Sequence, residues 1–475
     1  MNLIRQYPEI KILQDIAQEH KLQVYLVGGF LRDYVLKRPV NDFDFTVDKN
    51  ALKLAELFSK EVKGAYILLD EEHRCARVAK KVKGILMTYD FADYRAAEFA
   101  EDLSLRDFTI NTLAVNINTL KIDDELDQVI IDSKRGMKDI LGQKIKRTSI
   151  RSLRDDPLRM MRAFSHKANL DFKIELKTLN QIRKERELLR SVSYERIREE
   201  LFKILESDRT SDILKAMDKI GLLEIIIPQI HVMYDCKQGG YHHLDVWPHS
   251  LEVVRQLDKY FRENSDQEIK DYTDEIVGGG HSRRSIMKLA ALLHDIGKPD
   301  TRKKEEERVS FHGHEQVGRD ICKAIAKLLK LSTDERRLLE DMVFWHLRPG
   351  YLSNFKKPSE RMIYRFLRDT DREAAAVLIL SIADQRSTRG PLTTEADQKH
   401  HHNICNELIK TFFEKQKESP YVPLIDGNDV MKRLRLKGSP LIGKILTEVR
   451  EQHVLGKIKT SGEALELAKK LAKES

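Results

Sequence analysis

The stretch LVGGFLRDYVLKRPVNDFDFTV, residues 26–47, limits the fold more than any other part of this 475-residue chain. Its apolar start ends at two adjacent glycines, which let a backbone approach a ligand closely and leave N–H groups facing an anion. Its end alternates Asp42 and Asp44 with Phe43 and Phe45. On a strand, residues two apart share a face, so both carboxylates point one way and both rings point into a core. Two such carboxylates repel unless a cation lies between them, and Mg²⁺ is a hard ion that suits them, so the stretch predicts a magnesium site beside a phosphate-binding turn.

Neighbouring residues extend this site. Arg32 and Asp33 fall in the first turn of the helix expected after the glycines, where Arg32 can contact a phosphate and Asp33 suits the helix N-terminus. A third carboxylate is available from Asp90, in the apolar and strand-like run ILMTYDFA. An isolated Asp-x-Asp pair is more often a solubility device at a strand edge, and the glycines and arginine upstream are what favour the metal site.

Length and composition bound the class of protein. A chain of this length needs three or so structural units, and 41% hydrophobic residues are enough to form their cores. No apolar run is long enough to span a bilayer, and the first 21 residues carry charges throughout, so we predict a cytoplasmic protein with no membrane partner. The four cysteines are far apart and are expected to be free thiols. A net charge of +8 is compatible with a polyanionic partner, although many ordinary enzymes are equally basic.

The pattern of apolar, charged and histidine residues changes along the chain. Strand-like apolar runs mix with helices over 1–145, charged amphipathic helices dominate 146–235, histidines gather over 236–415, and a basic helical tail with a break at LKGSPLIG covers 416–475. The polar, glycine-containing segment 263–284 is expected to be an exposed loop. The pattern predicts an α+β protein with an α/β head, a helical neck and body, a helical histidine-rich domain and a helical tail.

The motifs of the first 205 residues occur in the order of a known family. The glycines, Arg32, Asp33 and the two aspartates resemble the GGxxRD…DxD signature of the class II tRNA nucleotidyltransferases and poly(A) polymerases. RDFTINTLAV (106–115) resembles the second motif of that family, and RDDPLRMMRAF (154–164) resembles its nucleotide-recognition helix. YERIREELFKIL resembles the segment that leads into the body of these enzymes.

The resemblance implies a DNA polymerase β-like head that adds nucleotides from CTP and ATP to the 3′ end of tRNA without a template. It implies that Asp42 and Asp44 are catalytic and hold two Mg²⁺ ions, as in two-metal phosphoryl transfer, and Asp90 is the third predicted catalytic carboxylate. The nucleotide-binding residues that it implies are Gly28, Gly29, Arg32, Asp33, Arg106, Asp107, Asn111, Asp156, Arg159 and Arg162. Asn111 has the alternative of being a core-facing cap.

The nucleotide-recognition motif suggests how bases are chosen. We expect Asp156 and Arg159 to lie on one helix, where residues three apart share a face, with Arg162 three further on. An aspartate accepts and an arginine donates hydrogen bonds. The pairing edges of cytosine and adenine offer an amino donor beside a ring-nitrogen acceptor, whereas uracil and guanine offer a carbonyl acceptor and a ring N–H. The pair therefore favours C and A, unless it is only a surface salt bridge.

Three departures from the family pattern bear on activity. Leu105 stands where the family has an arginine, Ser165 stands where another arginine is usual, and the segment Arg95–Leu105 is shorter than the flexible loop of full CCA-adding members. In this family the longer loop is associated with the change from CTP to ATP. The short segment therefore favours addition of CC alone.

A second constellation of residues occupies the histidine-rich region. His249, His294, Asp295 and Asp384 resemble the metal quartet of the HD phosphohydrolase family, and His314 and His346 are candidates for a substrate phosphate or a second metal. Histidine with aspartate suits a divalent transition metal such as Ni²⁺ or Mn²⁺. The resemblance implies a phosphodiesterase or phosphatase acting on RNA ends, with a purely structural domain as the alternative.

Other functions remain open at the level of sequence. The alternatives are a poly(A) polymerase, an HD phosphohydrolase with a weakened transferase head, to which Leu105 and Ser165 point, and an RNA-binding protein without activity. The basic tail resembles the C-terminal segment of bacterial family members and is expected to contact tRNA phosphates.

Overall fold

The computed structural model describes residues 1–239, 243–305, 308–390, 393–419 and 421–474. Contacts divide the chain into two compact units, the first of 1–207 with 215–226 and the second of 208–214 with 227–475. The four-part division expected from the sequence stays a prediction. Among the described residues, none of the helices combines the length and hydropathy that crossing a bilayer requires.

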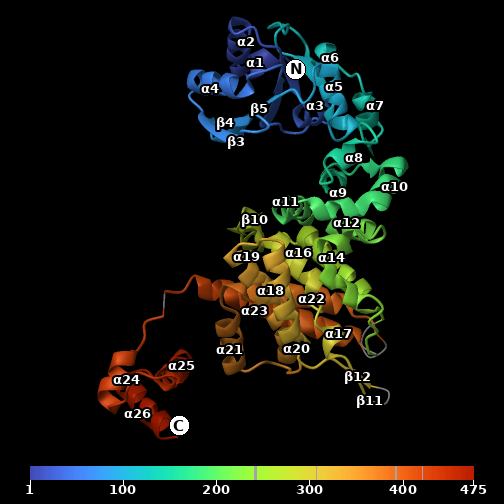
Figure 1. Cartoon of the computed structure of the whole chain (residues 1–475). Helices are drawn as coiled ribbons and strands as arrows, with labels where there is room; N and C mark the ends of the chain where they lie inside the picture. The colour runs from blue at the N-terminus through green and yellow to red at the C-terminus, as the bar shows by residue number, and fades with distance from the viewer. Residues whose placement is uncertain (240–242, 306–307, 391–392, 420, 475) are drawn as a thin grey trace. The chain divides into compact units, whose positions relative to one another are not determined.

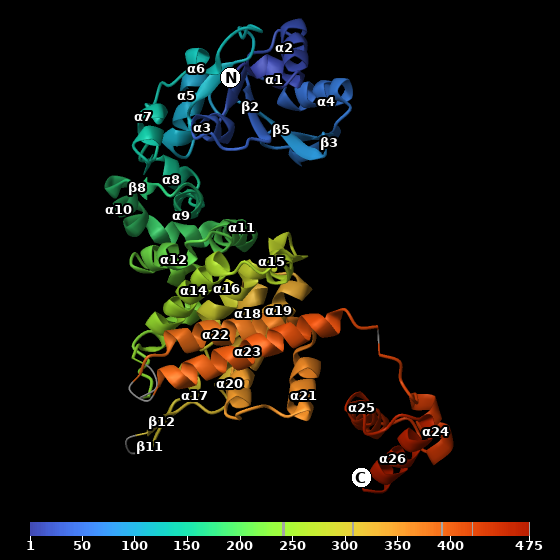
Figure 2. The ribbon, with the colours of Figure 1, turned by 180° about the vertical axis from the view of Figure 1, so that it is seen from behind.

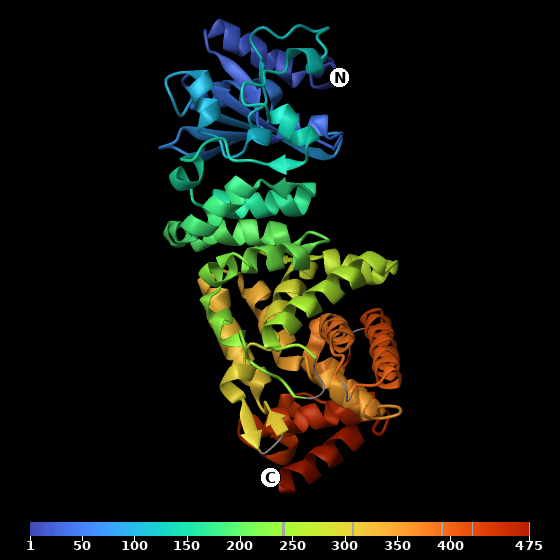
Figure 3. The same ribbon diagram turned by 90° about the vertical axis from the view of Figure 1, so that its right-hand side faces the viewer.

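A six-stranded mixed sheet forms the core of the head, the N-terminal part of the first unit (Figures 1 and 3). Its order is β3-β4-β5-β2-β1-β6; β2 and β5 run parallel, and the other neighbours are antiparallel. The strands are β1 (Val24–Val27), β2 (Asp42–Val47), β3 (Ala65–Asp70), β4 (Cys75–Val82), β5 (Ile85–Asp93) and β6 (Ala114–Asn116). The strands predicted in FDFTV and ILMTYDFA are therefore confirmed.

The apolar face of this sheet fixes the direction of the carboxylates. Phe43 and Phe45 are 1% and 2% exposed, and their rings stack at 5.1 Å on Tyr89 and Phe91 of the neighbouring strand β5. Helix α4 (Ala51–Val62) covers this face with Phe58. Because successive side chains of a strand alternate, burying the rings leaves Asp42 and Asp44 on the opposite face, as predicted.

Helices surround the sheet and continue into the body of the first unit. Around the sheet lie α1 (Leu3–Gln6), α2 (Glu9–Glu19), α3 (Gly29–Val35), α5 (Phe99–Ser104), the 3₁₀ turn η1 (Thr109–Asn111), α6 (Leu126–Val129) and α7 (Gly136–Leu141). The body contains β7 (Lys144–Ile145), α8 (Ser152–Asp155), α9 (Arg159–Leu170), β8 (Lys173–Ile174), α10 (Leu176–Glu185), η2 (Arg186–Ser191), α11 (Tyr194–Leu205) and α13 (Leu222–Ile226). The residues of α12 (Thr210–Asp218) are divided between the two units.

The second unit is helical (Figure 2). Its elements are η3 (Pro228–Met233), α14 (Val246–Glu263), α15 (Gln267–Asp274), the hairpin β9 (Ile276–Gly278) with β10 (His281–Ser282), α16 (Arg283–Leu293), α17 (Lys298–Thr301), the hairpin β11 (Lys303–Glu305) with β12 (Arg308–Ser310), α18 (His314–Leu328), α19 (Thr333–Trp345), α20 (Arg348–Ser353), α21 (Glu360–Thr370), η4 (Asp371–Glu373), α22 (Ala374–Ser387) and α23 (Glu395–Gln416). The four cysteines are free, as expected.

The prediction of an exposed loop over 263–284 was wrong. Asp266 caps α15 by accepting hydrogen bonds from two backbone N–H groups. Of the glycines that suggested a loop, Gly278 ends β9, and Gly279 and Gly280 form the turn to β10. His281 and Arg283 are buried at 6% and 2% exposure; His281 Nδ1 lies 2.5 Å from Glu335 Oε1, and Arg283 forms an ion pair with Glu373. These acidic partners come from distant helices and are not apparent in the local sequence.

The tail forms a small core of its own. It contains α24 (Gly427–Leu434), α25 (Pro440–Val454) and α26 (Ser461–Lys473), so the predicted break around LKGSPLIG is confirmed. Its buried side chains include Val430, Ile445 and Val449.

Candidate active site

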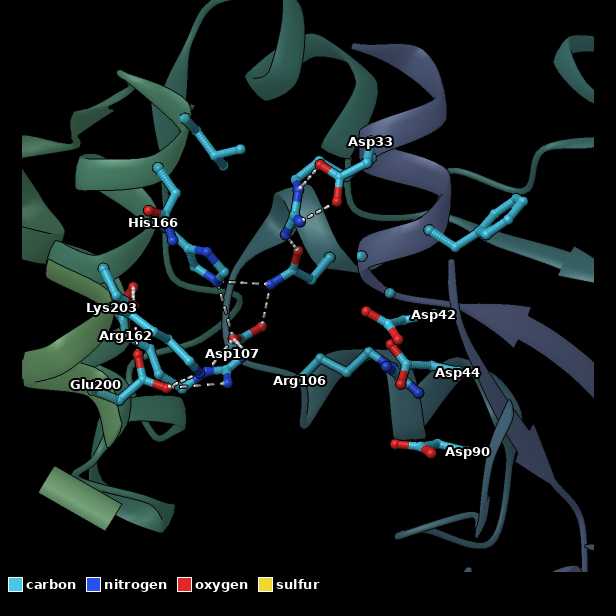
Figure 4. A pocket seen from close by; sticks show the side chains of 18 of the residues that line it. Asp33, Asp42, Asp44, Asp90, Arg106, Asp107, Arg162, His166, Glu200 and Lys203 are labelled. Carbon is cyan, nitrogen blue, oxygen red and sulfur yellow. Dashed lines mark hydrogen bonds and ion pairs between the residues drawn. The ribbon is translucent and has the colours of Figure 1, made fainter. Parts of the chain in front are cut away.

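Three carboxylates form a group on the open face of the head sheet. The parallel register of β2 and β5 places Asp44 directly beside Asp90, and Asp42 lies beside Thr88, whose hydroxyl donates to it. The three predicted catalytic aspartates are thus brought together on two neighbouring strands (Figure 4).

The negative charges of the three carboxylates repel one another, which favours a bound cation. Burial raises the pKa of Asp44; Arg106 opposes this shift, and the neighbouring Asp90 and Asp42 add to it. Asp90 accepts two hydrogen bonds from Arg77, at 2.7 Å from Nε and 2.8 Å from Nη2. Hard carboxylate oxygens that disfavour one another's charge fit Mg²⁺.

The glycine turn lies against these carboxylates. Gly28 follows β1 and is the N-cap of α3, with φ +81° and ψ −141°, a conformation that is essentially restricted to glycine. A Cβ atom at Gly28 would lie 2.8 Å from Asp44 Oδ2, so the turn approaches the carboxylate as closely as a backbone without a side chain allows.

The placement predicted for Arg32 and Asp33 needs correction. Helix α3 begins at Gly29, so Arg32 and Asp33 are its fourth and fifth residues and lie past the first turn. Asp33 therefore does not cap the helix; it accepts hydrogen bonds from Arg32 Nε at 3.0 Å and Nη2 at 2.7 Å. The remaining nitrogen, Nη1, donates to Asn111 Oδ1 at 2.7 Å, so Arg32 is fixed at the pocket wall.

A buried network is centred on Asp107. This side chain accepts from Asn111 Nδ2 at 3.0 Å and pairs with Arg162 at 2.8 Å. Burial opposes ionisation, but the Arg162 guanidinium holds the pKa of Asp107 well below its usual range. Burial also lowers the pKa of His166, whose Nε2 lies 3.8 Å from the Asp107 carboxylate. The network therefore joins the second motif to α9.

The expectation that Asp156 and Arg159 share one helix was wrong. Asp156 is extended, with φ −144° and ψ 96°, and separates α8 from α9, because the residue before a proline is disfavoured in helical conformation. Asp156 accepts from Arg196 Nη2 of α11 at 3.0 and 3.2 Å. Arg159 Nε lies 3.9 Å from Asp156, and Arg159 Nη1 donates to the Ser152 carbonyl at 3.0 Å.

The structure shows where the residues that depart from the family pattern lie and what they contact. Ser165 is 3% exposed and its hydroxyl donates to the buried carboxylate of Glu200, which also pairs with Lys203 at 2.8 Å. Leu105 is the C-cap of α5, the helix that occupies most of the short segment Arg95–Leu105. Asp102 of α5 accepts from the Arg95 backbone N–H at 3.0 Å and lies 3.6 Å from Arg106.

Most of these residues line one cavity of about 890 Å³, whereas Thr88, Asp102, Leu105 and Ser152 are not part of its wall. Every nucleotide-binding or catalytic residue predicted for the head is part of its wall. The wall also contains side chains that the sequence reasoning missed: Arg38, Arg77, Arg95, His166, Arg196, Glu200 and Lys203. Only His166 carried a local signal, since it lies one helical turn after Arg162.

A second group of side chains lies in the other unit. The ligand atoms of His249, His294 and Asp384 lie within 4.8 Å of one another, as do those of Asp295, His314 and His346. Asp295 lies between the two sets: its Oδ2 is 3.2 Å from His294 Nε2, and its Oδ1 is 3.4 Å from His314 Nε2. The six residues predicted from the sequence are thus brought together.

Three of these histidines are arranged as metal ligands are. His294, His314 and His346 each place Nδ1 within 2.6 to 2.9 Å of the backbone carbonyl three residues earlier. An N–H at Nδ1 leaves the lone pair of Nε2 facing the cluster, the usual second contact of a metal-bound imidazole. Burial and the neighbouring His314 lower the pKa of His346 to about 3, which keeps this ring neutral. The donor set therefore fits a divalent metal. Lys298, which the sequence reasoning missed, lies 2.6 Å from Asp295 Oδ2.

Comparison with known families gives three matches along the chain. Residues 24–146 match the poly(A) polymerase head domain, 171–233 match the probable RNA and SrmB-binding site of polymerase A, and 246–389 match the HD domain. The chain belongs to the tRNA nucleotidyltransferase and poly(A) polymerase family.

Relatives within this family match along nearly the whole chain. The chain is 28% identical over 459 residues to the A-adding tRNA nucleotidyltransferase of Deinococcus radiodurans, covering 95% of this chain and 96% of the relative. It is 27% identical to the CC-adding tRNA nucleotidyltransferase of Thermus thermophilus, covering 92% and 91%. The structure of a Thermotoga maritima CCA-adding enzyme complexed with tRNA is similar in fold, with a TM-score of 0.62 at 19% identity, covering 98% of this chain and 95% of that one.

Proposed function

We propose that this family member transfers nucleotides from CTP to the 3′ end of tRNA without a template, adding CC. The observation that carries the proposal is the single cavity in which Asp42, Asp44 and Asp90 meet the nucleotide-binding residues. The names of the relatives support tRNA as the acceptor.

In the proposed reaction, the 3′-hydroxyl oxygen of the RNA forms a bond to the α-phosphorus of the nucleotide, and pyrophosphate leaves. Asp42, Asp44 and Asp90 would hold Mg²⁺, which supplies charge stabilisation for the attacking and leaving oxygens. Each oxygen of Asp90 accepts one hydrogen bond from Arg77, so lone pairs remain on Asp90 for the proton of the attacking hydroxyl.

The chain's other residues bind and orient the nucleotide. Arg32 and Arg106 supply cationic nitrogens at the cavity wall for the triphosphate, and Arg32 is fixed there by Asp33 and Asn111. For the base, Asp156 accepts from an amino group while Arg159 donates to a ring nitrogen. Arg159 uses one nitrogen for the Ser152 carbonyl, so other N–H groups of the guanidinium are left for the base.

The restriction to CC rests on the segment Arg95–Leu105. It is short, largely helical, and closed on itself by the hydrogen bond that the Arg95 N–H donates to Asp102. Relatives named CC-adding and A-adding both match the chain, so the choice between CTP and ATP is the finer part of the proposal. Poly(A) polymerase is the alternative within this class of enzyme.

The test uses purified protein, magnesium, and tRNA transcripts ending before CCA, after C, and after CC. Each receives labelled CTP or ATP, and products are resolved to one nucleotide. We expect addition to stop at CC, with ATP refused even by the CC-ended transcript. Completion to CCA, or addition of A alone, overturns the restriction to CC, and long A tails support a poly(A) polymerase. Absence of any addition refutes the transferase.

A second activity is favoured by the six-ligand group around Asp295. We propose that the HD domain hydrolyses phosphate esters, since the carboxylate of Asp295 lies against histidines of both sets of candidate ligands. A divalent metal such as Ni²⁺ or Mn²⁺ held there would supply an activated water.

Matched double variants separate the two activities. Asp42→Ala with Asp44→Ala should abolish nucleotide addition and spare hydrolysis of bis-p-nitrophenyl phosphate. His294→Ala with Asp295→Ala should do the opposite and lower the bound metal measured by mass spectrometry. Loss of both activities from either pair, in protein that circular dichroism shows to be folded, refutes two independent sites.

A further inference from the structure

A cluster of exposed cations lies outside the active-site cavity, on α7 and the small sheet of β7 and β8. We name it the lysine groove, a hollow of about 600 Å³ lined by Arg135, Lys138, Lys144, Lys146 and Lys173. All five side chains belong to exposed residues. In the described parts of the chain, none of the five takes part in a recorded ion pair, whereas many surface lysines and arginines elsewhere do.

The strand register opposes two of these charges directly. β7 and β8 are parallel, and Lys144 is the register partner of Lys173. Neighbouring strands are only about 5 Å apart and partnered side chains point the same way, so the two ammonium groups repel at short range. Such a pair weakens the sheet unless an anion lies between the charges.

The two acidic side chains of the groove accept hydrogen bonds from threonine hydroxyls. Asp139 is 9% exposed and accepts from the Thr109 hydroxyl at 2.7 Å, and Glu175 accepts from the Thr178 hydroxyl at 3.0 Å. Two carboxylates among five cations leave the groove with a clear excess of positive charge.

The backbone connects the groove to the nucleotide pocket. The Lys146 carbonyl accepts from the Thr109 N–H at 2.9 Å, and the Thr148 N–H donates to the Asp107 carbonyl at 3.1 Å. The segment that carries Lys144 and Lys146 is therefore held against the segment that carries Asp107. An anion in the groove would be bound at a fixed distance from the nucleotide.

We propose that the lysine groove binds the phosphodiester backbone of the RNA substrate, an inference that rests on the proposed tRNA nucleotidyltransferase function. Lysines are flexible point charges that attract phosphates without reading sequence. Five cations spread over a helix and two strands exceed the charge of one small phosphate and suit a chain of phosphates. The groove has no aromatic lining on which a base of a free nucleotide would stack. Lys173 lies in the segment 171–233 that matches an RNA-binding family, but the other four cations lie outside it.

The test compares two triple variants that remove equal charge. Lys144→Gln, Lys146→Gln and Lys173→Gln are changed together in the groove, and Lys49→Gln, Lys83→Gln and Lys121→Gln, all exposed residues outside it, form the control. Dissociation constants for a tRNA transcript are measured by filter binding over a range of NaCl concentrations. Because each phosphate contact contributes about 0.7 to 0.9 to the slope of log K against log salt, the groove variant should lower that slope by about 2 to 3. The control should change it by much less, and CTP affinity should stay unchanged in both.

Further measurements on the same variants distinguish the possible explanations of a change in tRNA binding. Thermal unfolding should show the groove variant at least as stable as wild type, because a repulsive pair has been removed. Equal loss of slope in both triple variants refutes a specific groove. Displacement of tRNA by millimolar inorganic phosphate at constant ionic strength, seen in wild type but not in the groove variant, would show a site for a small anion and overturn the backbone assignment. Nucleotide addition is measured on the same preparations. If the wild-type protein adds nucleotides and the groove variant behaves as wild type does, only the groove proposal is refuted. If the wild-type protein adds no nucleotides, the transferase function itself is refuted.

Discussion

Substitution of Gly28 by alanine tests the geometry of the proposed metal-binding carboxylates most directly. The new Cβ would lie 2.8 Å from Asp44 Oδ2, and ordinary contact begins near 3.4 Å, so the carboxylate must move by about 0.6 Å. Catalytic groups need to be held within about 0.5 Å of their productive positions. Misplacement of about 1 Å can cost about 100-fold in rate, so we expect kcat/KM for CTP addition to fall about 30- to 100-fold.

The same change also strains the backbone, and the two effects must be separated. Gly28 has φ +81°, where a residue with a side chain costs about 1 to 3 kcal/mol. Gly84 offers a matched control, since it has φ +84° in the β4–β5 hairpin and an added Cβ would meet nothing within 4 Å. Gly84→Ala should therefore lose similar stability in urea unfolding and keep full activity.

Labelled CTP addition to a tRNA transcript, measured under single-turnover conditions, decides the outcome. If Gly28→Ala keeps the kcat/KM of Gly84→Ala while losing the same stability, the contact with Asp44 does not govern the reaction. The assignment of Asp44 as a catalytic carboxylate would then be refuted.

Three further predictions follow from the pocket. Arg77→Gln removes the cation that pairs with Asp90, the third carboxylate, so the affinity of the protein for Mn²⁺ should change about tenfold. Electron paramagnetic resonance on the protein without nucleotide or RNA measures this affinity. An unchanged affinity would show that the ion pair does not influence metal binding. Arg196→Ala frees Asp156, and discrimination between CTP and UTP should fall about tenfold in competition assays, whereas intact discrimination would exclude Arg196 as a positioning residue. Asp107 has a depressed pKa in the folded protein, so the stability that its ionised carboxylate contributes is present above about pH 4 and is lost as the pH falls further. Asp107→Asn should therefore be less stable than wild type at pH 7, by about 1 to 3 kcal/mol. Its free energy of unfolding in urea should fall less steeply than that of wild type between pH 5 and pH 3.

Local geometry explains what could be predicted for the head. Alternation of aspartate and phenylalanine in β2 determines which side chains share a face, because that depends only on the two-residue period of a strand. The order of the motifs likewise selected the candidate nucleotide-binding residues, all of which line one cavity. Where the prediction failed, the cause was also partly local: Pro157 follows Asp156 and breaks the helix that was expected to carry Asp156 and Arg159 together.

The sequence by itself therefore determined the strand faces, the family and the candidate ligands of both sites. Only the tertiary structure decided that Asp156 meets Arg196, that Arg77 holds Asp90, and that Asp295 lies between two sets of histidines. It also decided that Lys144 and Lys173 oppose each other across a small sheet. The physical reason is that a residue's own face follows from backbone periodicity, whereas its partner depends on strand register and helix packing between segments far apart in the chain.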